Sequence, residues 1–408
     1  MLLEPPLSLY VHLPWCVRKC PYCDFNSHAL KGGIPDTVYA AALLRDLQHD
    51  LPLVYGRPVQ TVFFGGGTPS LFKPEIIANL LDAMGEMLPI AADAEITLEA
   101  NPGTVERGRF AEYKAAGINR LSIGVQSLNN EHLRLLGRIH TAGEALHAAQ
   151  ETHAAGLDNF NLDLMYGLPT QTVAQALDDI RGALALEPAH LSHYQLTIEP
   201  NTYFHAHPPT LPDGETVWQM QQACGPLLEE QGYLQYEISA YARTNRRCRH
   251  NLNYWRFGDY LGIGAGAHGK LTDAKRGRIM RIWKIKQPQL YMRHAGSDQA
   301  VGDTRLIGAD DRIFEFMLNR LRLYEGFSPG DFETTTGLAF SSLQPALQEA
   351  ENSKLMQQTA GCWHPTSTGY AFLNDLQARF LPEKARQPCA SGTPADNCSS
   401  MPDLNIPA

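Results

Sequence analysis

The amino-acid sequence predicts an α/β fold in which the strands of a parallel sheet alternate with helices. Strand-like apolar runs and helical segments follow one another through the first half of the chain, separated by short turns rich in Gly and Pro. Such alternation is typical of right-handed βαβ units. Two closures of the sheet fit it, an open doubly wound sheet and a full or partial barrel. Polar residues gather where successive strands end, which favours the barrel, because barrel folds build their sites there.

The individual strands and helices are predicted from the period of their apolar residues. The first strand reads LSLYVHL, and the first helix carries Val38, Ala41, Leu44 and Leu47 on one face. The predicted strands are residues 7–13, 60–64, 95–100, 120–126, 159–165 and 190–197. The predicted helices are residues 36–51, 75–87, 107–116, the stretch from the fourth strand to about 136, 141–155 and 172–186.

Three of these strands carry a polar residue at or near their C-terminal end: Glu99, Gln126 and Asp163. A parallel strand that is buried on both faces is normally apolar throughout, so each of these residues needs a polar partner. A helix cap or a buried hydrogen bond would explain any one of them alone. Three on separate units instead indicate a shared site at one edge of the sheet.

A C-x₃-C-x₂-C run formed by Cys16, Cys20 and Cys23 follows the first strand. Pro14 and Pro21 favour a loop here, because proline disrupts the interior of a helix. An iron–sulfur cubane normally takes one cysteine for each of its four irons. Three cysteines therefore leave one iron open, and an open position allows a metal site to bind a small molecule.

Other interpretations of the cysteine run stay open on spacing alone. A zinc ion could take the three thiolates with His12 or His28 as its fourth ligand, although zinc sites more often combine two C-x₂-C pairs. The thiols could also be inert. A disulfide is disfavoured, because the chain shows no signal peptide at its start and intracellular thiols stay reduced.

Composition limits the class of function. The chain has 408 residues, 44% of them hydrophobic, and a formal net charge of −9. This charge argues against a surface that coats nucleic acid. A short basic run at residues 243–249 is interpreted as a solvated loop. No apolar run of about 18 residues or more is present, so we predict a cytoplasmic protein whose membrane contact is at most peripheral.

Two further features belong to the predicted site. The run Gly65-Gly66-Gly67-Thr68-Pro69 follows the second strand, and consecutive glycines allow a backbone to approach a ligand closely. It could equally be a tight strand-to-helix turn with proline near the helix start. Arg138, in LGRIH, could pair with a carboxylate through two hydrogen bonds, or could be an ordinary surface arginine.

Together, these features resemble the radical S-adenosylmethionine superfamily, whose signature is the C-x₃-C-x₂-C run with an aromatic residue, here Tyr22, before the last cysteine. The resemblance covers residues 7 to 197. It implies a partial (β/α)₆ barrel, a [4Fe-4S] cluster on Cys16, Cys20 and Cys23, and S-adenosylmethionine on the open iron, with reductive cleavage to a 5′-deoxyadenosyl radical. The cofactor contacts that it implies are Tyr10, Tyr22, Gly66, Gly67, Thr68, Glu99, Gln126, Arg138 and Asp163.

The runs YVHLPWC, FFGGGTPS, EANPGT, IGVQS, LGRIH and NLDLMYGLP are similar to the coproporphyrinogen-oxidase-like branch. Its oxygen-independent coproporphyrinogen III dehydrogenases carry a fourth cysteine two residues after the third, where this chain has Phe25. In both the absence of this cysteine and the presence of an H-N-x-x-Y-W motif, the chain instead resembles the heme-chaperone family. Oxidative decarboxylation of coproporphyrinogen is therefore the alternative and is not the expected activity. The implied heme contacts are His250, Asn251, Tyr254 and Trp255, with Cys248 as a second candidate iron ligand.

The same resemblance implies the domain organisation: a core barrel at 1–200, a barrel-completing region with the heme motif at 201–300, and a smaller C-terminal α+β domain at 301–380. A helix is predicted at 305–323, and 381–408 has the composition of a disordered tail. Cys389 and Cys398 are interpreted as inert thiols, because nothing near them has metal-ligand spacing. The implied partners are heme, heme-accepting apo-proteins, respiratory ones among them, and a second copy of the chain.

Overall fold

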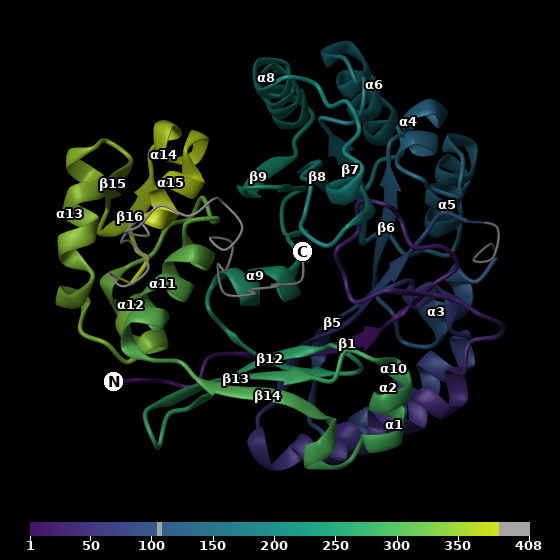
Figure 1. Cartoon of the computed structure of the whole chain (residues 1–408), viewed down its shortest axis with the longest axis horizontal. Helices are drawn as coiled ribbons and strands as arrows, with labels where there is room; N and C mark the ends of the chain where they lie inside the picture. Colours follow the sequence, from purple (N-terminus) through teal and green to yellow (C-terminus); the bar gives the residue numbers. More distant parts are fainter. Residues whose placement is uncertain (104–107, 383–408) are drawn as a thin grey trace.

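Six parallel strands form the centre of the computed structural model, in the order in which they occur along the chain (Figure 1). The structure describes residues 1–103 and 108–382. Neighbouring strands pair in parallel throughout. The predicted α/β fold with a partial (β/α)₆ barrel is confirmed. The six strands are β1 (Leu7–Leu13), β4 (Val59–Gly66), β5 (Ile90–Ala100), β6 (Arg120–Gln126), β7 (Phe160–Tyr166) and β8 (His190–Gln195).

The helices that connect these strands cover the outer face of the sheet. Two of them begin with a capping box, in which Thr141 pairs with Glu144 and Thr172 with Gln175. Such reciprocal bonds satisfy two of the free backbone donors at a helix start. The connecting helices are α1 (Asp36–Asp50), α2 (Pro74–Met87), α3 (Phe110–Ala115), α4 (Asn130–Leu135), α5 (Ala142–Ala154) and α6 (Val173–Leu184).

Further strands extend the barrel at both edges into a 12-stranded sheet. On one side, β11 (Asp259–Ile263) pairs in parallel with β1, and β12 (His268–Asp273), β13 (Arg278–Lys284) and β14 (Val301–Leu306) continue in antiparallel fashion. On the other side, β10 (Ala240–Ala242) and β9 (Leu234–Glu237) follow β8.

The prediction of a helix at 305–323 places the start of the helix too early. Arg305 lies in β14 opposite Arg281 of β13, and the helix α11 runs from Ala309 to Arg320. The apolar spacing that predicted the helix lies C-terminal to Gly308, and the earlier residues satisfy their backbone groups by pairing with a strand that the sequence pattern did not reveal.

The strands present apolar residues to the helices and polar residues to the barrel interior. In β1, Leu7, Leu9, Val11 and Leu13 belong to the main hydrophobic core. Because side chains alternate along a strand, Ser8, Tyr10 and His12 face the other way. The interior is therefore unusually polar for buried parallel strands, and its buried polar members include Ser8, Thr61, Thr97, Arg120, Ser122, Asn161, His190 and Ser192.

A second hydrophobic core belongs to the C-terminal part of the chain, at the left of Figure 1. Phe316 of α11 packs edge-on against Phe327 and Phe332. The barrel contributes Phe257 to the same core. The remaining elements are α12 (Pro329–Thr336), α13 (Gln344–Asn352), β15 (Met356–Thr359), β16 (Cys362–Pro365), α14 (Ser367–Ala371) and α15 (Leu373–Ala378). The predicted tail lies outside the described residues from 383 onward, and so do Cys389 and Cys398.

The short helix α9 (Arg249–Trp255) lies between the barrel strands and the C-terminal helices in Figure 1. It contacts β1, β4 and β11 on one side and α11 on the other. The remaining helices are α7 (Tyr203–Ala206), α8 (Gly214–Glu230) and α10 (Pro288–His294).

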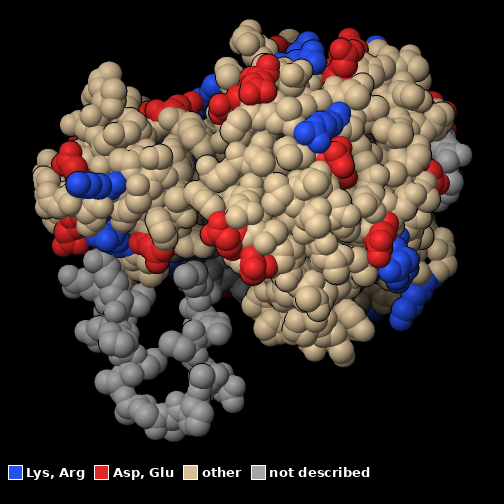
Figure 2. All heavy atoms as spheres, turned by 90° about the horizontal axis from the view of Figure 1, so that it is seen from above, with Lys and Arg blue, Asp and Glu red and all other residues tan. Residues whose placement is uncertain are grey.

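The surface is mixed in charge. On the face in Figure 2, acidic and basic side chains are scattered, and neither sign gathers into a patch. Among the residues that the structure describes, none of the helices has the length and apolar character needed to cross a membrane.

Candidate functional site

The predicted cysteine loop lies at the C-terminal end of β1. Cys16 ends the two-residue strand β2 (Trp15–Cys16), which pairs with β3 (His28–Ala29), and this pairing closes the loop that contains Cys20 and Cys23. The loop is fixed to the barrel by backbone bonds, because Gly67 N donates to Leu13 O and Thr68 N donates to Trp15 O, each over 2.8 Å. The cysteines therefore lie in a loop beside the glycine run, as the two prolines predicted.

Each of the three cysteine sulfurs has a polar neighbour from a different segment. The Thr68 hydroxyl donates to Cys16 Sγ over 3.5 Å, and Arg138 Nη1 donates to Cys20 Sγ over 3.6 Å. Cys23 Sγ lies 3.6 Å from the Ser27 hydroxyl. Burial raises the pKa of the Cys16 thiol to about 11 and also raises that of Cys23. Donors beside sulfur favour the thiolate form that a metal requires.

Asn101, which the sequence interpretation missed, connects two of these contacts. Its Nδ2 donates to Thr68 Oγ1 over 2.8 Å, and its Oδ1 accepts from Arg138 Nη2 over 2.5 Å. A polar chain thus runs from Cys16 through Thr68, Asn101 and Arg138 to Cys20. The available signal was positional, since Asn101 directly follows the end of β5, close to Glu99. Within the protein, Arg138 contacts this amide and the Gly124 carbonyl oxygen, which lies 2.7 Å from Arg138 Nη2.

The glycine run needs glycine because its backbone lies very close to the first strand and the start of the cysteine loop. Gly66 has a φ of +116°, and a Cβ there would lie 2.5 Å from the His12 ring. A Cβ on Gly67 would lie 2.6 Å from the Trp15 carbonyl oxygen. Both positions exclude larger residues. The Gly66 N–H donates to Glu99 Oε2 over 3.0 Å, so the glycine run and the end of β5 form one wall.

Two carboxyl groups, Glu99 and Asp163, face the same region from β5 and β7. Burial raises the pKa of Glu99 from 4.5 to about 8, with a further contribution from the charge of Asp163, and the Gly66 N–H opposes the rise. Burial also raises the pKa of Asp163, against hydrogen bonds from Asn161, Ser192 and Ser122. Among the described residues, the groups that donate to these two acids are neutral, and the charge of Arg120 offsets the rise at Asp163 only in part. A positively charged ligand would stabilise both carboxylates.

The other predicted cofactor contacts surround this wall. Gln126 ends β6 with a φ of +68°, and Gly124, two residues before it, leaves room for its amide and for Arg138. The Tyr10 hydroxyl bonds His12 Nδ1 over 3.0 Å. His12 Nε2 bonds the Asn26 carbonyl oxygen over 2.9 Å, so both of its ring nitrogens are occupied within the protein. Tyr22 packs against Phe204 of α7.

Glu99 predicts a pH dependence of stability in protein free of S-adenosylmethionine. The folded state holds the Glu99 proton more tightly than the unfolded chain does, so its contribution is complete below pH 4.5 and is lost as the pH rises to about 8. Replacing Glu99 by Gln removes this dependence. The difference in melting temperature, Glu99→Gln minus wild type, should therefore increase as the pH is raised from about 5 to about 8.5. A difference that stays constant across scanning-fluorimetry curves in that range would contradict the assignment.

The heme motif predicted from sequence lies in α9, and its histidine is buried in the barrel. His250 Nδ1 is 2.7 Å from Thr61 Oγ1, and Nε2 is 2.9 Å from the Tyr254 hydroxyl. Because Thr61 donates its own hydrogen to Ser8, His250 Nδ1 is the donor to Thr61, and Nε2 accepts from Tyr254. Burial lowers the pKa of His250 to about 3, so the imidazole is neutral.

The rest of the motif is also enclosed. Tyr254 and Trp255 are buried, Asn251 is partly buried, and the His250 ring stacks on Phe63 at 4.9 Å between centroids. Cys248, the second candidate iron ligand, is buried with its sulfur 3.6 Å from Glu95 Oε1, and burial raises its pKa to about 12. In this conformation the motif is therefore enclosed between the barrel strands and the C-terminal helices.

Buried hydrogen bonds connect the two regions. Asn161 donates to Asp163 over 2.7 Å and bonds His190 Nδ1 over 2.7 Å, and His190 Nε2 bonds the Tyr236 hydroxyl over 2.8 Å. Tyr236 in turn accepts from Cys248 N, at the start of α9. A continuous polar path therefore joins the carboxylates at the strand ends to the motif helix.

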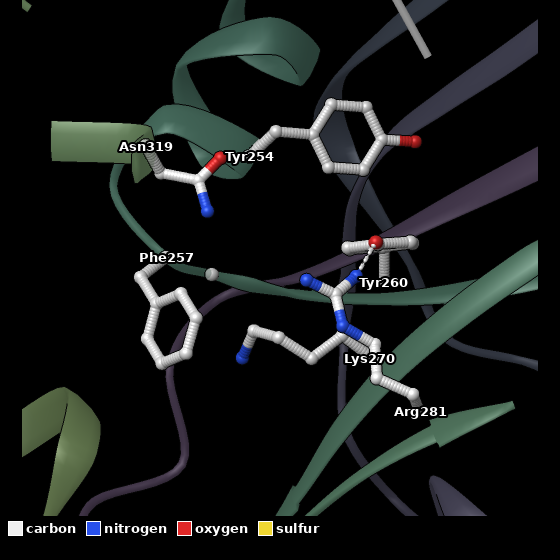
Figure 3. Close-up of a pocket in the computed structure, with 7 residues that line it drawn as sticks. Tyr254, Phe257, Tyr260, Lys270, Arg281 and Asn319 are labelled. Atoms are coloured by element: carbon white, nitrogen blue, oxygen red, sulfur yellow. Dashed lines mark hydrogen bonds between the residues drawn. The ribbon is translucent and has the colours of Figure 1, made fainter. Parts of the chain in front are cut away.

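A small pocket lies beside the motif, at the junction with the C-terminal helices (Figure 3). Lys270 and Arg281 extend toward it from β12 and β13, and Asn319 enters from α11. Arg281 donates to the Tyr260 hydroxyl and also pairs with Glu315. Asn319 Oδ1 is buried without a partner in the described part of the chain, so packing between barrel and C-terminal domain is incomplete here. The pocket lining is Tyr254, Phe257, Gly258, Tyr260, Lys270, Arg281 and Asn319.

The residues at the strand ends fit the cofactors that the sequence predicted. Arg138 Nε is buried without an acceptor among the described residues, and burial raises the pKa of both Glu99 and Asp163. A zwitterionic sulfonium ligand supplies both a carboxylate and positive charge. Within 1–103 and 108–382, no three His, Cys, Asp or Glu side chains are grouped to hold one metal ion. A cubane has a different requirement, because each cysteine binds a separate iron.

Comparison with known proteins gives matches to both halves of the chain. The family model for the radical SAM superfamily matches residues 10–181, and the model for the HemN C-terminal domain matches residues 307–372. The chain is 51% identical to the heme chaperone HemW of Escherichia coli (strain K12), over 94% of this chain and 100% of that protein. It is 50% identical to the heme chaperone HemW of Haemophilus influenzae, over 93% of this chain and 99% of that protein.

Among solved structures, the coproporphyrinogen III oxidase HemN from Escherichia coli, a radical SAM enzyme, has a similar fold. The likeness covers 92% of this chain and 90% of that chain, with a TM-score of 0.78 and 24% sequence identity. At this identity the structural likeness shows only that the two proteins share a fold, a barrel of this type followed by a smaller domain.

Proposed function

The chain belongs to the HemW family of radical SAM proteins, and from that premise we propose that it is a chaperone that binds heme and transfers it to apo-proteins. The observation that carries the proposal is the match, along nearly the whole chain, to relatives that are named heme chaperones. Phe25, at the position where the oxidase-type resemblance calls for a fourth cysteine, supports the same choice. Coproporphyrinogen turnover is not part of the proposal.

In this proposal, Cys16, Cys20 and Cys23 hold a [4Fe-4S] cluster. The cluster supplies one-electron chemistry at its open iron when bound. Arg138 and Thr68 stabilise the sulfurs through the contacts described above. The glycine run and the strand ends would hold S-adenosylmethionine: Arg138 would pair with its carboxylate, and Glu99 and Asp163 would face its positive charge. Its remaining contacts are Tyr10, Tyr22, Gly66, Gly67, Thr68 and Gln126.

Heme is proposed to bind at α9, with His250 as its axial ligand. A neutral imidazole has a lone pair available for iron, and in His250 that lone pair lies on Nε2, which the Tyr254 hydroxyl now occupies. Ligation therefore requires Tyr254 to move, and both residues belong to the same helix. Tyr254 and Trp255 then offer aromatic surface to the porphyrin, and Asn251 offers an amide.

The acceptors are apo-proteins that use heme, respiratory ones among them, and the protein acts in the cytoplasm as a homodimer, with at most peripheral contact with membranes and none with nucleic acid. The cluster and S-adenosylmethionine control assembly or transfer, and the polar path through Asn161 and His190 joins their site to α9.

A hemin titration of the anaerobically purified protein tests the function. The wild type should bind hemin saturably, release it to an apo-protein and leave coproporphyrinogen unconverted. His250→Ala should weaken hemin binding by about tenfold or more and change the absorption spectrum, because it removes an axial ligand. His147→Ala, an exposed histidine of α5, is the control.

Different results contradict different parts of this proposal. Steady conversion of coproporphyrinogen would overturn the chaperone function in favour of the dehydrogenase. Unchanged affinity and spectrum in His250→Ala would remove His250 as the ligand and leave Cys248 as the remaining candidate.

A further inference from the structure

Three arginines surround one carboxylate where α9 meets the C-terminal domain. Arg256, the residue after the motif, donates from Nε and Nη2 to Glu325, each over 2.8 Å. Arg320 Nη1 lies 3.7 Å from the same carboxylate, and Arg247 Nη1 lies 3.9 Å from it. Glu325 comes from the turn after α11, so its carboxylate connects the C-terminal domain to both ends of α9.

The Glu325 cluster has more donors than acceptors. Arg247, Arg256 and Arg320 carry three positive charges, and Glu325 and Asp331 carry two negative ones. A buried guanidinium whose charge is not matched is costly. Burial lowers the pKa of Arg320 despite both carboxylates, which is the direction expected where neutralisation is incomplete.

Unpartnered N–H groups lie beside the cluster. Trp255 Nε1, Arg320 Nε and Arg322 Nε are buried without an acceptor in the part of the chain that the structure describes. Trp255 and Arg320 are each only 5% exposed. Arg322 lies over the Trp255 ring, 4.3 Å from its centroid. Arg322 also pairs with Glu237 through Nη2, 2.9 Å away. Each of the three groups is a donor, so the partner that each lacks is an acceptor.

The cluster is also accessible from outside. The side chains of Arg247 and Arg256 are 46% and 48% exposed, and that of Glu325 is 31% exposed. A carboxylate from solvent can therefore reach the arginines that Glu325 now engages, and an arginine can bind such a carboxylate through two parallel bonds. Heme carries two carboxylates, its propionates, on a flat apolar ring.

We propose that Glu325 occupies the arginine cluster in the heme-free protein and that a heme propionate replaces it when heme binds at α9. This inference rests on the proposed function, because it takes heme as the ligand of α9. It adds a subsite, formed by Arg247, Arg256 and Arg320, that recognises a porphyrin carboxylate. Because Glu325 connects α9 to the C-terminal domain through Arg256, its replacement by a propionate would loosen that contact.

The test compares hemin with hemin dimethyl ester, which keeps the ring and the iron but lacks both carboxylates. The wild type should bind hemin about tenfold more tightly than the ester, the difference typical of one charge-assisted pair. Glu325→Gln should tighten hemin binding about fivefold, because the internal competitor is gone, and leave ester binding unchanged. Arg256→Gln should weaken hemin binding about tenfold and abolish the preference over the ester. Arg181→Gln and Asp178→Asn, which break an exposed pair on α6, are the matched controls.

The outcomes separate this inference from the proposed function. Saturable, His250-dependent hemin binding with equal affinity for the ester would overturn the subsite and leave the chaperone function standing. Unchanged or weaker hemin binding by Glu325→Gln would overturn the replacement of Glu325. Absence of saturable hemin binding in the wild type would overturn both. The wild-type comparison of the two ligands needs no variant, so a folding defect in a variant leaves the test intact.

Discussion

Each of the variants Cys16→Ala, Cys20→Ala and Cys23→Ala is expected to lose the brown absorbance of a [4Fe-4S] cluster after anaerobic purification. A cubane held by three thiolates already lacks a protein ligand on one iron, and removing another cysteine leaves two. The three sulfurs are held by contacts to different segments, through Thr68, Arg138 and Ser27. None of the other described cysteines lies in this loop to replace a lost thiolate.

Visible absorption together with iron and sulfide content per chain measures this loss. Cys362→Ala, on β16 of the C-terminal domain, is the matched control and should keep the cluster. Full retention of iron in all three loop variants would return the cysteine run to the zinc or inert alternatives. Loss of absorbance without loss of the folded state, monitored by circular dichroism, would separate a ligand role from a structural one.

Replacing Lys284 by Met is expected to destabilise the protein by about 3–5 kcal/mol, the range for breaking a buried ion pair from one side. Lys284 Nζ lies 2.7 Å from both Asp46 and Asp50 of α1, and these side chains are 1–3% exposed. Without the lysine, two carboxylates stay buried together, with the Tyr291 hydroxyl 2.7 Å from Asp46 and His49 Nδ1 3.1 Å from Asp50. Methionine keeps the apolar stem, so the lost charge dominates the effect.

Urea denaturation measures this cost, and its pH dependence identifies the cause. Burial already raises the pKa of Asp46 in the wild type, and removing the cation raises it further. The raised pKa of Asp46 favours the folded variant at low pH and penalises it as the pH rises, so the deficit should be larger at about pH 8 than at about pH 5. Arg181→Met, in an exposed pair with Asp178, should cost about 0.5 kcal/mol or less. A similar cost for the two variants would contradict the buried-pair argument.

The Lys284 network also explains how a distant segment supports the cysteine loop. Asp46 accepts from the Gly264 N–H over 3.3 Å. The next residue, Ala265, accepts from Asn26 Nδ2 over 2.8 Å, and Asn26 belongs to the cysteine loop. A Cβ on Gly264 would lie 2.4 Å from the His12 carbonyl oxygen. The glycine-rich stretch after β11 therefore packs as a turn against the cysteine loop.

The amino-acid sequence by itself determined the strand–helix repeat, because the periods of 2 and 3.6 residues are local properties. It also determined the three cysteines, the glycine run and the polar residues at the strand ends, because parallel strands bring their carboxyl ends to one edge. In the structure, Gly66, Glu99 and Gln126 lie at or near the C-terminal ends of β4, β5 and β6, and the Gly66 N–H donates to Glu99. The error at Arg305 arose where a strand is defined by its partner and not by its own pattern.

Only the tertiary structure decided the partners of the polar residues. It placed Asn101 between Thr68 and Arg138, paired Lys284 with two aspartates more than 200 residues away in sequence, and occupied both His250 nitrogens with Thr61 and Tyr254. It also brought Glu325 to the arginines around α9. Such contacts depend on how distant segments pack, and a side chain's charge, tautomer and availability follow from the neighbours that packing brings to it.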